Sequence, residues 1–376
     1  MPEHGYRSWV EVSRERIAEN YRALKQATAP DTEIMPVVKA DAYRHGAIEV
    51  SRVLEREGVR WLAVSSADEG CALREAGIAA RILVMADFLP SEREQLLDYS
   101  LTPVIHSLDD IRALNEVSER RAEPAQYHLK IDSGMGRLGT RSEPDEIARI
   151  VAANPWAKLE GVMTHFASAA DYSSRQTDDQ LARFSFVSEG LERAGIRPAY
   201  VHLSSTIPLA YGRRAAWGNL IRPGHAIYGY ISPPRGTAPA RIVNVKPALA
   251  WKAAILAIKD IPEGAYIGYG GIYRAPRPLR IAVLAAGYAD GIPHRLSNRG
   301  RVIAGGRLVP ILGAVSMDVT TIDVTQCPQL RVGDAVTLMG TEGEASIDAQ
   351  QIARVAGTIS YSVLCGISAR VKRVYL

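Results

Sequence analysis

The feature that most constrains the fold is an alternation of short apolar runs with amphipathic segments between about residue 14 and about residue 238. Each amphipathic segment carries apolar residues at helical spacing, and several end at a glycine, as Ala47–Glu57 does before Gly58. Eight strands with helices between them predict an α/β fold, a (β/α)8 TIM-like barrel, although a doubly wound sheet also fits the alternation. The expected strands are Ile34–Lys39, Trp61–Ser65, Ile82–Met85, Thr102–Ile105, Tyr127–Ile131, Leu159–His165, Tyr200–Leu203 and Leu220–Arg222.

After about residue 239 the pattern changes to short strands that glycine, proline and aspartate interrupt. We therefore predict a barrel domain over residues 14–238 and a mostly β C-terminal domain over residues 239–376. Arg7–Val12 alternates like a strand, and we expect residues 1–13 to pair with the C-terminal domain. The expected strands there are Ala248–Ile258, Arg280–Ala286, Arg301–Ile303, Val309–Val315, Ala335–Met339 and Ala369–Tyr375, with one helix at Asp348–Ala356.

Composition and charge narrow the classes of function. The chain has 376 residues, of which 47% are hydrophobic and 23% charged, which is enough for two domains with large cores. A net charge of +4, with basic residues scattered among acidic ones, gives nucleic-acid binding little support and suits a small anionic ligand. Three widely spaced cysteines indicate neither a disulfide framework nor a metal site. Neither a signal peptide nor a membrane-spanning run is visible, so we expect a cytoplasmic protein that does not bind membranes.

Polar side chains gather at the carboxyl ends of the expected strands, where barrel enzymes carry their active sites. Lys39 ends an apolar run in the segment VVKADAY. A lysine on this rigid platform can form an imine with an aldehyde cofactor once desolvation has favoured its neutral form. Each such residue alone also fits a structural role, but together they would face one mouth of the barrel. The others are Lys130, Asp132, His165, Ser204, Thr206 and Arg222.

Eight motifs in the chain resemble those of the alanine racemases, which are pyridoxal-phosphate enzymes with a barrel fold. They are VVKADAY around Lys39, KIDSGMGRLG at Lys130–Gly139, GVMTHFASA at Gly161–Ala169, IRPGHAIYG at Ile221–Gly229, IGYGGIY at Ile267–Tyr273, GYADGIPH at Gly287–His294, VPILGAVSMD at Val309–Asp318 and GTISYSVLC at Gly357–Cys365. The resemblance runs nearly end to end. It implies pyridoxal 5'-phosphate bound to Lys39, which acidifies the α-hydrogen of an amino acid.

The resemblance also implies a role for each site residue. Lys39 and Tyr269 would be the catalytic bases on opposite faces of the substrate, and Tyr269 would come from the partner subunit of a homodimer with shared active sites. Tyrosine is a poor base at its ordinary pKa of about 10, and His165 and Arg222 would assist it. Arg222 would also donate a hydrogen bond to the pyridine nitrogen. The positions that would bind the cofactor phosphate are Tyr43, Thr206, Gly224, His225 and Tyr361. Arg137 and Met317 would bind the substrate carboxylate. Lys130 matches a lysine that is carbamylated in some members of the family.

Several positions depart from the pattern of the family. Arg44 stands where glycine is usual, Ser205 replaces asparagine, Ser316 replaces cysteine and His225 replaces an apolar residue. Ala314 and Ser362 replace an arginine and a glutamate. None of these changes removes a base, but they leave room for serine or another small amino acid as substrate.

Three classes of hypothesis follow. The first is an alanine racemase that supplies D-alanine for peptidoglycan or serves alanine catabolism, with a racemase of serine or of broader specificity as its variant. The second is a related barrel-fold decarboxylase or aldolase that uses pyridoxal phosphate. Arg222 argues against it, because those enzymes usually place an acidic residue at the pyridine nitrogen. The third is a catalytically silent cofactor-binding protein, which would not need a base on each face.

Overall fold

The computed structural model describes residues 5–86 and 88–376, and the chain divides into two compact units. The larger unit comprises Ile17–Ala42 and Ala47–Lys246. The smaller unit comprises the residues up to Arg16, Tyr43–Gly46 and Pro247–Leu376. Within the described residues, no helix combines the length and the apolar character that crossing a bilayer requires.

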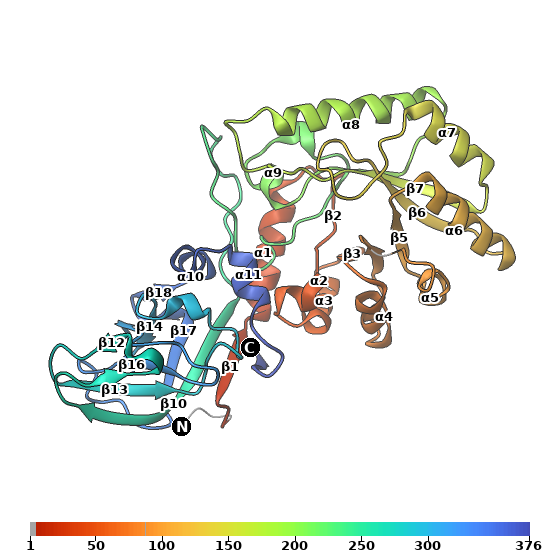
Figure 1. Cartoon of the computed structure of the whole chain (residues 1–376). Helices are drawn as coiled ribbons and strands as arrows, with labels where there is room; N and C mark the ends of the chain where they lie inside the picture. The colour runs from red at the N-terminus through yellow and green to blue at the C-terminus, as the bar shows by residue number, and fades with distance from the viewer. Residues whose placement is uncertain (1–4, 87) are drawn as a thin grey trace. The chain divides into compact units, whose positions relative to one another are not determined.

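The larger unit is built on parallel strands (Figure 1). Six of them form one parallel sheet in chain order: β3 (Trp61–Val64), β4 (Arg81–Val84), β5 (Thr102–Ile105), β6 (Ala125–Lys130), β7 (Ala157–Met163) and β8 (Tyr200–His202). β2 (Glu33–Ile34) pairs in parallel with β9 (Leu220–Ile221). Val37 bridges to Ala63 of β3, and Gly218 bridges to His202 of β8, so the eight strands follow one another around a curled sheet. The predicted barrel fold is confirmed, although the first strand is shorter than expected.

Helices connect the strands and cover the outer side of the sheet, as Figure 1 shows for the segment from β5 to β7. Their buried residues recur at intervals of three and four, as Leu108, Ile111 and Leu114 do in α6. α4 begins with a capping box in which Ser66 and Glu69 exchange hydrogen bonds with each other's backbone. The helices are α1 (Arg14–Ala27), α3 (Ala47–Arg56), α4 (Ala67–Glu75), α5 (Arg93–Asp98), α6 (Leu108–Arg120), α7 (Pro144–Ala153), α8 (Gln176–Arg193) and α9 (Thr206–Ala210).

The smaller unit is mostly β-sheet, as the sequence predicts. Its long central strand, β10 (Leu249–Ile261), pairs with β1 (Ser8–Val12), β13 (Leu279–Leu284) and β17 (Ala335–Glu342). Buried residues alternate from Leu249 to Ile255 of β10, so one face of this part of the strand packs into the core. The remaining elements are β11 (Tyr266–Ile267), β12 (Tyr273–Arg274), β14 (Arg301–Ala304), β15 (Arg307–Pro310), β16 (Thr320–Asp323), β18 (Ala345–Ile347), β19 (Lys372–Tyr375), α10 (Ala349–Ala356) and α11 (Ser360–Cys365).

Candidate active site

Lys39 lies at the start of a left-handed turn and not at the end of a strand. α2 (Lys39–Tyr43) contains the first four of five consecutive residues with φ between 52° and 67°, Ala40 to Arg44, and none of the five is glycine. Such a conformation costs about 1–2 kcal/mol per residue. The Ala40 amide donates to Glu69 Oε1 at 2.6 Å, and the Ala42 amide donates to the Val38 carbonyl at 2.8 Å. These bonds stabilise the turn that follows the lysine.

Five predicted site residues of the larger unit lie close enough to influence one another's charge. Burial, followed by the charges of Arg222, Lys130, Arg137 and Lys39, lowers the pKa of His165 to about 3. Burial, followed by Arg137 and Arg222, lowers the pKa of Lys130 to about 8. His165 is therefore neutral at pH 7, and the cluster as a whole favours an anionic ligand.

Arg222 is buried, with 2% of its surface exposed. Four of its five N–H groups are engaged: Nη1 donates to Nδ1 and to the carbonyl of His202, and Nη2 donates to the carbonyls of Thr164 and Leu203. Nε–H has no acceptor among the residues that the structure describes. Burial lowers the pKa of Arg222 to about 9, so the guanidinium stays charged at neutral pH. The site thus holds a fixed donor that a ligand acceptor can satisfy.

Two of the residues predicted to hold a phosphate, Gly224 and His225, lie in a turn beside a third, Thr206, which is the first residue of α9. The Ala226 amide donates to Thr206 Oγ1 at 3.3 Å, which joins the turn at Gly224 and His225 to Thr206. The ring of His225 is buried and stacks on Tyr230, with centroids 5.1 Å apart. The histidine that replaces the family's apolar residue at position 225 therefore places a ring, stacked on Tyr230, beside this turn.

The other predicted site residues belong to the smaller unit. Tyr43 and Tyr361 lie together, with ring centroids 5.9 Å apart, and burial raises the pKa of Tyr43. Tyr269 follows β11 and Met317 precedes β16, and their exposed fractions are 76% and 53%. A tyrosine side chain of that exposure is available to a ligand or to another chain.

Two polar residues prove to be structural. Asp132 accepts hydrogen bonds from three backbone amides of the Gly134–Gly136 turn and pairs with Arg141 at 2.8 Å, so it shapes the loop that carries Arg137. Arg44 Nε donates to the Cys365 carbonyl at 3.3 Å, so its side chain is held within the smaller unit. Lys130, two residues before Asp132, is only 5% exposed, so the two do not form an exposed ion pair.

His128, His202 and Glu160 form a polar chain in the barrel interior that was not predicted from the sequence. Nδ1 of His128 lies 2.8 Å from Nε2 of His202, and Nε2 of His128 lies 3.5 Å from Glu160 Oε2. The spacing in the sequence could have identified His128. It is two residues from Lys130, and side chains two residues apart in a strand lie on the same face of the sheet. Two inward polar residues in one apolar strand indicate a polar interior layer.

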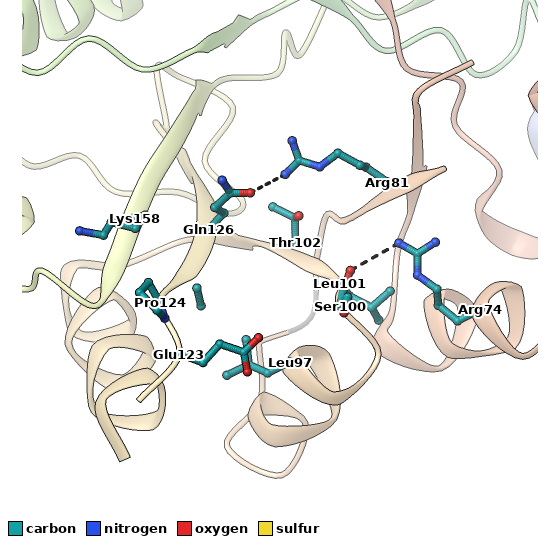
Figure 2. A pocket seen from close by; sticks show the side chains of 11 residues that line it. Arg74, Arg81, Leu97, Ser100, Leu101, Thr102, Glu123, Pro124, Gln126 and Lys158 are labelled. Carbon is teal, nitrogen blue, oxygen red and sulfur yellow. Dashed lines mark hydrogen bonds between the residues drawn. The ribbon is translucent and has the colours of Figure 1, made fainter. Parts of the chain in front are cut away.

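One cavity of the larger unit lies away from this cluster. A cavity of roughly 420 Å³ lies at the amino ends of β4 to β7, and Figure 2 shows Arg81, Gln126 and Lys158 in its wall. Predicted site residues follow the carboxyl ends of the strands, at the opposite end of the sheet. The cavity is therefore separate from the candidate active site.

The buried histidines predict a pH limit on stability. Burial lowers the pKa values of His128 and His202, that of His165 falls to about 3 and that of His106 to about 4. Below pH ~6.5 the histidines of the unfolded chain bind protons, whereas those of the folded barrel stay neutral. The free energy of unfolding therefore falls as the pH falls, by ~1.4 kcal/mol per pH unit for each fully buried histidine. Urea unfolding at pH 7.5, 6.5, 5.5 and 4.5 should show this slope, and His106→Gln should reduce it. Equal stability at pH 7.5 and 5.0 would contradict the prediction.

Comparison with known proteins places the whole chain in one group. Residues 12–233 match the model of the alanine racemase N-terminal domain, and residues 248–375 match that of the C-terminal domain. The alanine racemase of Carboxydothermus hydrogenoformans is 39% identical over 368 residues, which cover 98% of this chain and 99% of the relative. That of Halothermothrix orenii is 38% identical over 370 residues, covering 98% and 96%.

Solved structures agree with the sequence relatives. The alanine racemase of Clostridium difficile 630 superposes with a TM-score of 0.92 at 33% identity, covering 100% of this chain and 97% of the other. The Bacillus anthracis enzyme, with bound L-Ala-P, has a TM-score of 0.89 at 32% identity and covers 98% and 95%. The Bartonella henselae enzyme, with covalently bound pyridoxal phosphate, has a TM-score of 0.86 at 26% identity and covers 99% and 100%.

Proposed function

Because the chain belongs to the alanine racemase family, we propose that it interconverts L- and D-alanine with pyridoxal 5'-phosphate as cofactor. The observation that carries this proposal is the buried Arg222, whose one uncommitted N–H belongs to the same charged cluster as Lys39. The cluster offers an amine and a fixed hydrogen-bond donor, the two groups that a pyridine aldehyde requires.

The residues present fit this cofactor. When bound, pyridoxal phosphate withdraws electrons from the α-carbon of an amino acid and so acidifies its α-hydrogen. We assign Lys39 to its aldehyde carbon, Nε–H of Arg222 to its ring nitrogen, and Arg137 to the substrate carboxylate, which a guanidinium binds bidentately. Arg222 donates but cannot give up its proton at neutral pH, so it would leave the ring nitrogen neutral. We assign the phosphate to Tyr43, Thr206, the amides of Gly224 and His225, and Tyr361.

We assign the second base to Tyr269 of the partner subunit, and the substrate carboxylate also to the backbone of the partner's Met317. The chain would then work as a two-fold homodimer. The support is the exposure of the segment that begins at β11, where Tyr266, Tyr269 and Ile272 are 69%, 76% and 54% exposed. Apolar side chains gathered in this way are typical of a surface that a partner covers. His165, neutral and beside Arg222, would accept or donate a hydrogen bond at the tyrosine hydroxyl.

Lys130 is a candidate for carbamylation, in which its neutral amine adds carbon dioxide and releases a proton. Its lowered pKa, about 8, favours the neutral amine, and the resulting carbamate would place a negative charge among Arg137 and Arg222. Incubation with ¹³C-bicarbonate should give a carbamate carbon signal that Lys130→Arg lacks. The exposed Lys158 provides the control, since Lys158→Ala should keep the signal. Identical spectra for the wild type and Lys130→Arg would refute the modification.

The experiment that tests the function is a screen of pure enantiomers. Purified protein with added pyridoxal phosphate is incubated with L-alanine, D-alanine or L-serine, and the enantiomer ratio is followed with time. We expect both alanine enantiomers to reach equal amounts. Turnover of serine in preference to alanine would support the broader-specificity alternative, and release of carbon dioxide would support a decarboxylase. Unchanged enantiomers in every incubation would refute the proposal.

A further inference from the structure

A chain of polar side chains crosses the interior of the barrel behind Arg222. Arg222 Nη1 lies 2.7 Å from Nδ1 of His202, Nε2 of His202 lies 2.8 Å from Nδ1 of His128, and Nε2 of His128 lies 3.5 Å from Glu160. Glu160 then accepts two hydrogen bonds from Arg81, each 2.7 Å long. Arg81 also bonds Gln126 at the wall of the cavity, as Figure 2 shows. The chain therefore connects the candidate active site with the amino ends of the strands.

The first donor sets the direction of every bond that follows. A guanidinium has no acceptor, so Nδ1 of His202 must accept and its proton must be on Nε2. That proton is directed to Nδ1 of His128, which then carries its own proton on Nε2, facing the Glu160 carboxylate. Both rings are entirely buried, and burial holds their pKa values below the ordinary range. Two neutral histidines in one tautomer thus link a buried cation to a carboxylate.

The surrounding structure leaves room for this arrangement. Gly161 of β7 pairs with His128, and a Cβ atom at Gly161 would lie 2.6 Å from the ring nitrogen Nδ1. The ring of His128 also packs against Trp61 and Tyr200, with centroids 5.4 and 5.8 Å away. At Glu160, burial alone would raise the pKa of the carboxyl, but the His128 ring 3.5 Å away and the two hydrogen bonds from Arg81 lower it to about 2. Glu160 is therefore charged at neutral pH.

We propose that Glu160, His128 and His202 are positioning residues, a polar chain of fixed proton orientation that helps to hold the Arg222 guanidinium and compensates its buried charge. The proposal rests on the function proposed above for Arg222. A guanidinium held by a neutral acceptor on one side keeps its remaining N–H in one direction. Loss of the chain would weaken one of the four hydrogen bonds that orient Arg222 and would leave its buried charge without the remote carboxylate.

The polarity of the chain is testable without turnover. The full-length protein with pyridoxal phosphate, labelled with ¹⁵N at histidine, is examined by NMR between pH 6 and 8, and His128→Gln and His202→Gln supply the assignments. We expect both rings to be neutral with the proton on Nε2 and to keep their shifts across this range. A proton on Nδ1 of His202, or titration of either ring, would overturn the chain even if the protein is a racemase.

Two matched substitutions of His128 test whether the chain contributes to the candidate active site. His128→Gln keeps an acceptor for His202 and a donor for Glu160, whereas His128→Leu keeps neither. We expect kcat for alanine to fall ~10-fold in His128→Leu with KM little changed, the absorbance of the bound cofactor to shift, and His128→Gln to restore both. A merely structural role would lower the amount of folded protein and leave the absorbance per bound cofactor unchanged. Identical kcat and absorbance in wild type and His128→Leu would overturn the proposal.

Discussion

Lys39→Ala is expected to abolish the covalent attachment of pyridoxal phosphate and to lower racemisation by roughly four orders of magnitude or more. The substitution removes the amine that we assign both to the cofactor and to one face of the substrate. It leaves the backbone of the left-handed turn in place, because the bonds that stabilise the turn come from the Ala40 and Ala42 amides. The variant should therefore fold normally.

The absorbance of the lysine-bound cofactor measures the loss of covalent attachment. The enantiomer ratio of alanine with time separately measures the loss of racemisation. Lys158→Ala is the matched control, because Lys158 is exposed in the wall of the cavity at the amino ends of the strands. It should retain both the absorbance and the activity. A Lys39→Ala protein that still turns over both enantiomers would remove Lys39 from the mechanism.

Tyr269→Phe is expected to slow removal of the α-hydrogen from L-alanine by roughly 10²–10⁴-fold, because only the hydroxyl that we assign as the second base is lost. The ring is largely exposed, so the change removes no buried contact within the chain. Removal of the α-hydrogen from D-alanine, which we assign to Lys39, should suffer less. Racemisation requires a proton transfer on each face of the substrate, so its rate should fall with that of the slower transfer.

Exchange of the α-hydrogen with deuterated water, followed separately for each enantiomer by NMR, distinguishes the two faces. Tyr266→Phe provides the control, since Tyr266 is exposed in the same segment and lies three residues away. It should exchange both enantiomers at the wild-type rate. Wild-type exchange from L-alanine in Tyr269→Phe would exclude Tyr269 as the base for that face.

Much of the architecture could be predicted because it depends on local pattern. Each apolar run that ends near a polar residue became a strand of the barrel, and the amphipathic runs became helices, since burial of one face is encoded at short range. The first strand was the exception. Its predicted end at Lys39 is a left-handed turn of five residues without glycine, which no local preference favours and which long-range bonds such as Ala40 to Glu69 stabilise.

The sequence by itself determined the order of strands and helices and the family, because periodicity and motifs depend on residue type and spacing along the chain; the two proposed bases are what the resemblance to that family implies. Only the tertiary structure decided that Lys130 is buried while Asp132 belongs to a loop, that Arg222 keeps one N–H available, and that His128 lies between His202 and Glu160. The physical reason is that burial and hydrogen-bond direction depend on which distant strands become neighbours. No single segment of the sequence specifies the strand with which it pairs.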